Sequence, residues 1–328
     1  MTDATVIVGV DGGGTRTRCI AVDAAGRFVA AGESGPLMGL YVGDEGAEGA
    51  LEAALGRCVA ELPTAASIER VGISVPICNR ERLTAVAQAH APGAAVRWIE
   101  GEALACLAAA TDARRGLVIL SGTGSFADAV DGDAVVGHAG GFGPLLGDDG
   151  SGYAIGIAAL RAAVRASQAR GEPTALQRAA REHFDVADLW GLVGRLYGGR
   201  LPREQIAAFA PTVIRLAEEG DAAAGDVVRR AADDLADMAR AAVRQAGWEG
   251  QSFPVVLCGG VLDASETLRG EVVRRLAEAA PGDEPISSRF APVVGVALLA
   301  MGRRRAALPG TIANLEATLP GALKTGRR

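Results

Sequence analysis

The chain has 328 residues, which suits two packed lobes of ordinary size better than one small domain. Hydrophobic residues make up 49% and charged residues 22%, as in globular proteins, and a net charge of −6 with only 4% aromatic residues argues against binding to nucleic acid or to an anionic membrane. Glycine, at 45 residues, is too frequent for turns alone, which predicts loops whose backbone approaches a ligand closely.

The sequence carries no targeting signal and no metal-binding spacing. No apolar run reaches the length of a membrane span, and residues 1–4 lack the basic region and apolar core that begin a signal peptide. The five cysteines form no Cys-x-x-Cys pair, and the three histidines are far apart in the sequence. We therefore expect a cytoplasmic protein with reduced thiols, without membrane contact and without a zinc site built from these histidines.

A strand–turn–strand pattern opens the chain. The β-branched run at residues 6–10 predicts a buried strand, which ends in a corner of sequence Asp-Gly-Gly-Gly-Thr at residues 11–15. Strands at 18–22 and 27–31, joined by an Asp/Gly turn, complete an antiparallel meander. The further elements predicted before residue 115 are a helix at 45–62, a strand at 71–75, a helix at 80–90, a strand at 95–99 and a helix at 102–110.

The same pattern begins again at residue 116. A buried strand at 116–120 runs into a corner of sequence Ser-Gly-Thr-Gly-Ser at 121–125, and strands at 126–130 and 134–137 follow around a second Asp/Gly turn. Two copies of one unit predict a duplicated, two-lobed α/β fold, although two meanders could also arise independently. The expected lobes are residues 1–115 and 116–302, and the basic segment 303–328 is a tail or a helix packed on the N-terminal lobe.

The second half also contains a long helical insertion. A glycine-dense loop at 140–152 precedes a helical region at 153–247, which is broken near 171–173, 198–199 and Pro211. The elements expected after it are a strand at 254–258 that ends in Gly259 and Gly260, a helix at 267–279, an extended segment at 285–287 and an apolar helix at 293–301.

The first corner has the chemistry of a phosphate site. Its glycines, Gly12, Gly13 and Gly14, remove Cβ atoms, so successive backbone N–H groups can surround an anion. The hydroxyl of Thr15 can donate to a phosphate oxygen, and Asp11 can hold Mg²⁺ directly or through water. The spacing fits neither a Walker P-loop nor a dinucleotide fingerprint. An ordinary glycine hairpin is the alternative interpretation of this corner taken alone.

Two further glycine motifs make the phosphate interpretation more specific. The corner at 121–125 repeats the same chemistry with Thr123, so two corners facing each other could clamp a polyphosphate from both sides. Gly259 and Gly260, directly after a strand, form a third point of close approach, suited to a flat adenine or a ribose.

The order of these motifs resembles the superfamily of sugar kinases, Hsp70 and actin, in which two duplicated ribonuclease H-like lobes close on ATP in an interlobe cleft. Within it, the corners at 11–15 and 121–125 and the loop at 140–152 resemble the N-acetylglucosamine kinase and BadF/BadG/BcrA/BcrD ATPase family. The loop is the most specific part, because the family shows a very similar Gly-Gly-[Trp/Phe]-Gly…Gly-Asp-[Glu/Asp]-Gly-Ser string. The resemblance extends over residues 6–302.

The resemblance implies roles for individual residues. Asp11 serves Mg²⁺, and the ATP phosphates are held by the first corner, where Gly12 to Thr15 lie, and by Thr123. Gly259 and Gly260 flank the adenosine. The residues that line the hexose are Ser125, Gly141, Phe142, Gly143 and Asp148. Phosphoryl transfer then rests mainly on positioning and charge neutralisation, with an acidic side chain as general base.

Two departures from the family pattern lie on the acceptor side. The base of the sugar kinases is an Asp at the start of a helix, and Glu102 occupies that place here, with a side chain one methylene longer. The sugar kinases also hold the sugar with an Asn where this chain has Met38. Either the acceptor is not N-acetylglucosamine, or another group replaces that contact. These single residues also have structural interpretations: Asp148 could cap the helix that follows it, and Glu102 could be a first-turn acid.

The sequence thus predicts an ATP-dependent kinase that phosphorylates a hydroxyl of an amino sugar, glucosamine or N-acetylglucosamine-like, or of a related small sugar. The alternatives are an ATPase-type regulator of a partner protein and a sugar-sensing module without catalysis. The resemblance implies a homodimer. Some family members hold an iron–sulfur cluster through cysteines, but no cysteine lies in the glycine corners or the 140–152 loop, which weakens that interpretation. The sequence does not reveal which sugar or which hydroxyl is used.

Overall fold

The computed structural model of the chain describes residues 5–199, 201–277, 285–302, 306 and 309–324. It divides into two compact units. Unit 1 comprises Met1–Arg114, Val130–Val135 and Ser287–Arg328, and unit 2 comprises Arg115–Ala129 and Val136–Ile286. The segment after Ser287, expected to be shared between the C-terminal lobe and a tail, therefore clusters with the N-terminal sheet.

Two five-stranded sheets have the same topology. The strands of the first are β1 (Thr5–Gly12), β2 (Thr17–Asp23), β3 (Phe28–Ser34), β4 (Ser67–Ser74) and β5 (Ala95–Trp98), in the order β3-β2-β1-β4-β5. The strands of the second are β6 (Arg115–Ser121), β7 (Ser125–Asp131), β8 (Ala134–Gly140), β9 (Val255–Cys258) and β10 (Ile286–Ser287), in the order β10-β9-β6-β7-β8. Taken from β8, the second order matches the first strand by strand, which confirms the predicted duplication.

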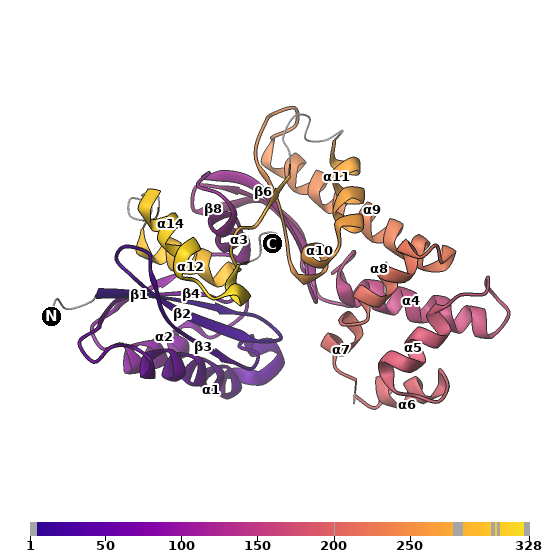
Figure 1. Cartoon of the computed structure of the whole chain (residues 1–328), viewed down its shortest axis with the longest axis horizontal. Coiled ribbons are helices and arrows are strands. Elements are labelled where there is room, and N and C mark those ends of the chain that lie inside the picture. The colour runs from indigo at the N-terminus through magenta and orange to yellow at the C-terminus, as the bar shows by residue number, and fades with distance from the viewer. Residues whose placement is uncertain (1–4, 200, 278–284, 303–305, 307–308, 325–328) are drawn as a thin grey trace. The chain divides into compact units, whose positions relative to one another are not determined.

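Strand β1 is central and buried on both faces. It pairs antiparallel with β2 and parallel with β4, so its apolar run is continuous rather than alternating. Val8 and Val10 pack into the core that covers one face, and Ile7 packs into the core on the other. Helices α1 (Gly39–Ala60) and α2 (Arg80–His90) cover the first face, and α12 (Pro292–Met301) lies on the second (Figure 1).

Glycines allow α12 to approach the sheet and its neighbouring helix α3 (Glu102–Ala110). A Cβ on Gly9 of β1 would lie 2.6 Å from the backbone nitrogen of Ala297, and one on Gly295 of α12 would lie 1.8 Å from the carbonyl oxygen of Ala105. Both approaches involve backbone atoms, which cannot rotate away. The apolar helix predicted at 293–301 is therefore a central part of unit 1.

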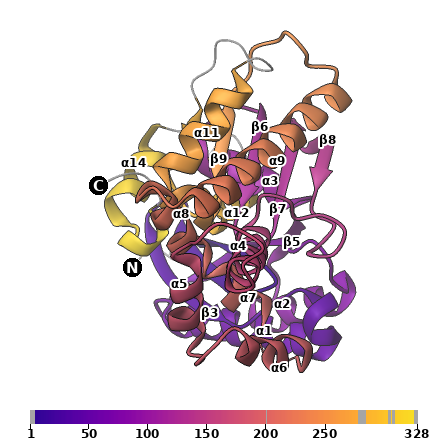
Figure 2. The same ribbon diagram turned by 90° about the vertical axis from the view of Figure 1, so that its right-hand side faces the viewer.

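Unit 2 consists of the second sheet and a helical layer around one hydrophobic core. Its helices are α4 (Gly152–Ser167), α5 (Leu176–Phe184), α6 (Trp190–Tyr197), α7 (Arg203–Ala207), α8 (Ala210–Glu218), α9 (Ala222–Ala246), α10 (Gly260–Ala264) and α11 (Glu266–Leu276). The long helix α9 runs beside α8 and α11 in both views (Figures 1 and 2), and its apolar side packs into the core.

The predicted elements agree with the structure in type and differ at their ends. The helix expected at 45–62 begins earlier, at Gly39, with a kink at Gly43, where φ is 70°. Pro211 lies in the first turn of α8, where a proline is tolerated, and so marks a helix start. Helix α10 was not predicted, whereas α14 (Pro309–Thr318) agrees with the helix that was one of the two alternatives for the segment 303–328. The last residues of the helix expected at 267–279 lie outside the described residues.

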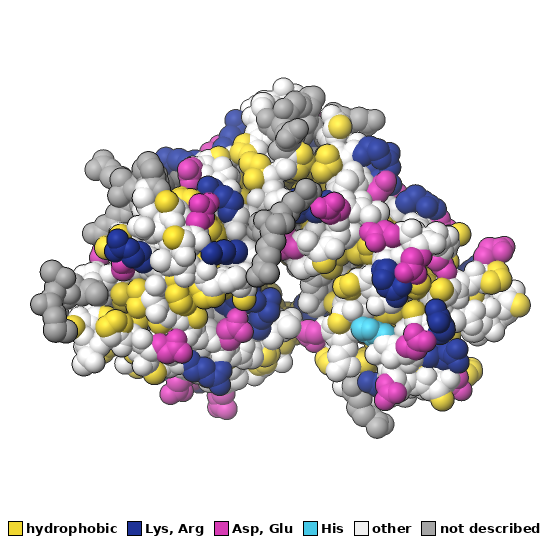
Figure 3. Space-filling model, in the orientation of Figure 1, with side chains coloured by type: hydrophobic (Ala, Val, Ile, Leu, Met, Phe, Trp, Pro, Cys, Tyr) yellow, Lys and Arg dark blue, Asp and Glu magenta, His cyan; other side chains and the backbone are white. Residues whose placement is uncertain are grey.

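The surface agrees with the composition. On the face seen in Figure 3, acidic and basic side chains are interspersed over both units, without a large patch of one sign. Among the residues that the structure describes, no helix combines the length and the apolar character needed to span a membrane.

Gly295→Ala should destabilise unit 1 by about 2–3 kcal/mol, because its methyl group overlaps the Ala105 carbonyl oxygen and α12 must shift. The matched control is Gly49→Ala in helix α1 of the same unit, where a Cβ meets nothing within 4 Å. That substitution should leave stability unchanged or raise it by up to about 1 kcal/mol through helix propensity. Urea unfolding followed by circular dichroism measures both, and equal effects would contradict the tight packing of α12.

Candidate active site

The first glycine corner is anchored to the loop that follows β3. The turn closes through a hydrogen bond from Gly13 N to Arg16 O (3.0 Å), and the carbonyl oxygen of Gly13 accepts hydrogen bonds from Leu37 N (3.0 Å) and Met38 N (3.3 Å). Gly12 cannot carry a side chain, because a Cβ there would lie 2.3 Å from Leu37. The corner and the Met38 loop, predicted to serve the phosphates and the acceptor respectively, are therefore one structure.

Asp11 lies at the end of β1, next to this corner. Burial raises the pKa of its carboxyl group to about 6, against the opposing effect of the positive charges of Arg18 and Arg16. A carboxylate whose charge is this poorly compensated suits a cation. Among the described residues, no three His, Cys, Asp or Glu side chains cluster to bind a metal. Asp11 thus fits Mg²⁺ of the kind that is held by one carboxylate, waters and nucleotide phosphates.

Glu102 begins α3 at the same edge of the sheet. Strands β1, β4 and β5 are parallel, so the segments that follow them emerge together at their carboxyl ends. The segment after β5 is held by a bidentate ion pair between Arg80 and Glu100, with both N–O distances 2.7 Å. Gly101 has φ of 96°, which turns the chain into α3 and puts Glu102 in its first turn. This placement suits both the catalytic and the helix-dipole interpretation of Glu102.

In unit 2, the second corner is joined to the glycine-dense loop by hydrogen bonds. They are Ser121 Oγ to Gly150 O (2.8 Å), Ser125 Oγ to Asp149 O (2.7 Å), Gly141 N to Ser125 O (2.8 Å) and Gly152 N to Gly122 O (2.8 Å). Ser121 and Ser125 thus both donate their hydroxyl hydrogens to backbone carbonyl oxygens of the loop. In the described part of the chain the Thr123 hydroxyl makes no such bond to the loop, as its predicted phosphate role requires.

Asp148 lies where the loop crosses the corner. Its side chain is buried, its φ is 56°, and its Oδ1 is 3.5 Å from Ser125 N. A Cβ on Gly124 would lie 3.0 Å from this carboxylate. Burial raises the pKa of Asp148, opposed chiefly by the Ser125 N–H. The capping interpretation of Asp148 is wrong, because the cap of α4 is Ser151, whose Oγ accepts from Ala154 N at 3.1 Å.

The turn after β9 meets the same corner. Gly259 has φ of 97°, and a Cβ on it would lie 2.5 Å from the carbonyl oxygen of Ser121, whereas a Cβ on Gly260 meets nothing within 4 Å. Gly259 O then accepts a hydrogen bond from Asp263 N (2.8 Å), and burial raises the pKa of Asp263 to about 6. Unit 2 therefore brings together the predicted phosphate corner, adenosine turn and acceptor loop, which are far apart in the sequence.

Sequence reasoning missed one polar pair beside the acceptor loop. His138 Nδ1 lies 2.6 Å from Oδ1 of the buried Asp128, and its ring centroid is 6.2 Å from that of Phe142, which is exposed. The two residues are equidistant in sequence from Asp133 at the turn between β7 and β8, so a hairpin register would have brought them together.

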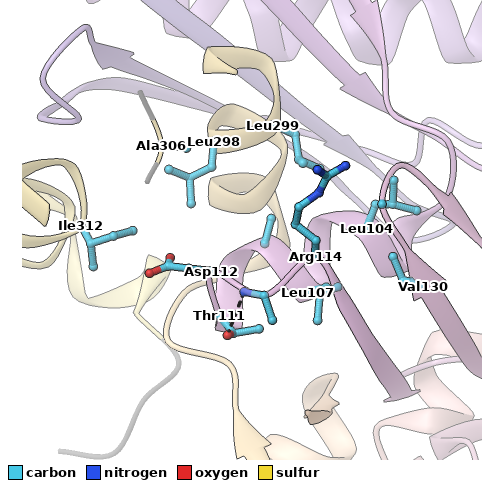
Figure 4. A pocket seen from close by; sticks show the side chains of 13 residues that line it. Leu104, Leu107, Thr111, Asp112, Arg114, Val130, Leu298, Leu299, Ala306 and Ile312 are labelled. Atoms are coloured by element: carbon cyan, nitrogen blue, oxygen red, sulfur yellow. Dashed lines mark hydrogen bonds between the residues drawn. The ribbon is translucent and has the colours of Figure 1, made fainter. Parts of the chain in front are cut away.

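A separate pocket in unit 1 contains none of the predicted site residues. It has a volume of about 190 Å³ and lies among α3, α12 and α14, with Leu104, Leu107, Leu298 and Ile312 in its lining (Figure 4). Asp112 and Arg114 lie on its polar side, with the Arg114 side chain directed toward Leu299.

The duplicated sheets and the glycine corners define a two-lobed ATPase of the actin and sugar kinase type. The model of the BadF/BadG/BcrA/BcrD ATPase family matches residues 8–300, and the chain belongs to this family. This confirms the resemblance seen in the three glycine motifs.

Known sugar kinases are similar to most of the chain. An N-acetyl-D-glucosamine kinase of Dictyostelium discoideum is 28% identical over 92% of this chain and 99% of its own length. An N-acetylmuramic acid/N-acetylglucosamine kinase of Clostridium acetobutylicum is 26% identical over 62% of this chain and 66% of its own. Among solved structures, a candidate N-acetylglucosamine kinase from Chromobacterium violaceum is 27% identical, covers 91% of this chain and 99% of its own, and has a TM-score of 0.67.

Gly259→Ala should lower the melting temperature measurably and weaken ATP binding at least about tenfold, because its methyl group overlaps the Ser121 carbonyl oxygen in a left-handed backbone conformation. Gly260→Ala is the matched control for folding and should leave the melting temperature unchanged, because its Cβ points into open space. Differential scanning fluorimetry and a fluorescent ATP analogue test the pair. Equal melting temperatures for both variants would contradict the contact between the turn and the corner.

Asp11→Asn should abolish phosphoryl transfer and yet stabilise the protein in EDTA at about pH 7.5. The pKa of Asp11 is higher in the folded chain than in the unfolded chain, so folding favours its protonated form. Its contribution to stability is complete below the unfolded pKa and is lost as the pH rises through about 6. The gain from Asn should therefore shrink toward zero near pH 4. A gain that is constant with pH in urea unfolding would contradict the burial of this charge.

Proposed function

We propose that the protein is an ATP-dependent kinase that transfers the γ-phosphoryl group of ATP to a hydroxyl of an amino sugar or a closely related small sugar. The observation that carries the proposal is the convergence in unit 2 of three predicted parts of the site. Hydrogen bonds join the phosphate corner to the acceptor loop, and the adenosine turn at Gly259 lies against the Ser121 carbonyl oxygen of that corner. The relatives named as N-acetylglucosamine kinases support the same substrate class.

In this proposal the donor side is built mainly from backbone. The N–H of Gly13 closes the turn to Arg16, so the phosphates are contacted by the N–H of Gly14 and the hydroxyls of Thr15 and Thr123. Gly259 and Gly260 let the adenosine approach the chain. Asp11 would hold Mg²⁺, which neutralises phosphate charge when bound. Because the donors are N–H groups and a cation, the protein's net negative charge does not oppose ATP binding.

The acceptor is oriented by Ser125, Asp148 and the segment from Gly141 through Phe142 to Gly143, and Glu102 acts on its hydroxyl. The hydroxyl oxygen attacks the γ-phosphorus as the bond to the β–γ bridging oxygen breaks. Its proton passes to the Glu102 carboxylate, and ADP leaves. The longer glutamate side chain moves the carboxylate by about 1.5 Å relative to an aspartate, so the acceptor must sit correspondingly further from α3.

A second candidate follows from the acceptor side alone. Met38 in place of the usual Asn and Glu102 in place of the usual Asp would both fit a sugar-sensing module without catalysis. Such a module would bind sugar without releasing ADP. We also propose a homodimer, as the family resemblance implies, that acts in the cytoplasm, as the unpaired cysteines suggest.

Glu102→Gln should reduce kcat at least about 100-fold, because an amide cannot accept the hydroxyl proton, while ATP binding stays intact. Glu102→Asp keeps the charge and shortens the reach, so it should retain more activity than Gln on every accepted sugar. ADP release is measured with glucosamine, N-acetylglucosamine, N-acetylmuramic acid and glucose. Full activity in Glu102→Gln would overturn the base assignment, and sugar binding without ADP release from the wild type would favour the sensing module.

A further inference from the structure

The Asp128–His138 pair in unit 2 has no role in the mechanism derived above. Asp128 lies on β7 and is only 6% exposed, whereas the His138 side chain on β8 is 47% exposed. The two are joined by the 2.6 Å contact between Nδ1 and Oδ1. One half of the pair is therefore buried in the fold and the other half reaches the surface.

The buried carboxylate fixes the hydrogen on the imidazole. An ionised carboxylate can only accept hydrogen bonds, so Nδ1 must be the donor and, in the neutral ring, Nε2 is left as an acceptor. Burial raises the pKa of Asp128, and the hydrogen bond from His138 opposes part of this rise by stabilising the ionised carboxylate. The backbone N–H of His138 donates a hydrogen bond to Gln245 Oε1 (3.0 Å), which holds strand β8 in place.

The oriented imidazole lies beside the acceptor loop. A Cβ on Gly141 would lie 3.5 Å from His138 Cε1 and 3.7 Å from Nε2, and Phe142 is the next residue. Gly141 leaves this space open because it has no Cβ, and its φ of 72° disfavours any residue with a side chain. Among the described residues, no hydrogen-bond partner for Nε2 is found.

We propose that His138 is a specificity-determining residue that binds the acceptor, and that Asp128 is its positioning residue. Nε2 accepts a hydrogen bond from an N–H, N–H₃⁺ or O–H donor of the acceptor sugar bound at Gly141 and Phe142. The inference rests on the proposed kinase function. It also supplies a polar contact to an acceptor site that lacks the usual amide at Met38.

The group that binds Nε2 must be a hydrogen-bond donor, and the negative charge around His138 favours an ammonium group. The Asp128–His138 pair carries one negative charge when the imidazole is neutral, and the nearby loop adds the carboxylates of Asp148 and Asp149. Arg203, which acts on Asp148, is the basic group that opposes them. Three sugars distinguish the possible donors. Glucosamine, a free hexosamine, presents an ammonium group; N-acetylglucosamine, an N-acylated hexosamine, presents an amide N–H; and glucose, a hexose, presents a hydroxyl.

Two substitutions distinguish acceptor binding from a structural role. His138→Asn keeps a donor near Nδ1 for Asp128 but has no atom at Nε2, whereas His138→Gln extends an amide toward the Nε2 position. We expect KM for the preferred acceptor to rise about tenfold in His138→Asn and by no more than about threefold in His138→Gln, with kcat and KM for ATP nearly unchanged. The reverse order, with Asn retaining the wild-type KM, or an unchanged acceptor KM in both, would overturn the proposal.

Asp128→Asn tests the positioning residue. An amide donates to Nδ1, which moves the ring hydrogen to Nε2 and turns that atom into a donor. KM should then rise about tenfold for glucosamine and N-acetylglucosamine, whose nitrogen groups face Nε2 as donors only, and less for glucose, whose hydroxyl can also accept. An equal rise for all three acceptors would contradict this tautomer argument. If the wild type released ADP with none of these sugars, the kinase function would fail instead.

Discussion

The set of hydrogen bonds between the corner at 121–125 and the loop at 140–152, here called the seam, is the constraint on which unit 2 depends. Ser121 and Ser125 donate their hydroxyl hydrogens to carbonyl oxygens of the loop. The conformation of the corner therefore depends on the loop, and that of the loop depends on the corner. The seam also fixes its neighbours. Gly259 fits against the Ser121 carbonyl oxygen, and Ser151, at the end of the loop, caps α4. The corner, the loop and the turn at Gly259 therefore depend on one another for their positions.

The glycine content follows from this arrangement. Gly124 faces the Asp148 carboxylate, Gly259 faces the Ser121 carbonyl oxygen, and Gly295 faces that of Ala105, so in each place a side chain would displace a polar or backbone atom. Other glycines, such as Gly260, have open space where a Cβ would be. The first kind allows segments of the protein to meet, whereas the second is not required by contacts within the protein. Packing within the protein therefore accounts for only part of the excess that the composition showed.

The sequence predicted much of the fold because the strands are short buried runs that end in glycine corners, a local signal that both halves repeat. It also located the motifs of the candidate site. It did not predict that α12 would pack on the N-terminal sheet, because that contact depends on Gly9 and Gly295, far apart in the chain. It missed the Asp128–His138 pair for a similar reason: the pairing arises from the register of β7 and β8, whereas a search for metal or catalytic spacing compares residues along the sequence.

Electrostatics connects the stability of the protein to its proposed ligands. Asp11, Asp148 and Asp263 all have a pKa raised by burial, so the protein without ligands holds carboxylates in places that disfavour their charge. Such an arrangement costs folding free energy, and it persists where a bound cation or hydrogen-bond donor offsets the cost. In the proposed function, Asp11 would hold Mg²⁺ and Asp148 would accept hydrogen bonds from a sugar. Burial also raises the pKa of Asp128, but this carboxyl has a partner within the fold, because the hydrogen bond from His138 offsets part of the effect. Its charge is available at the surface only through the imidazole, which is why the identity of the acceptor, rather than the binding of ATP, should depend on this pair.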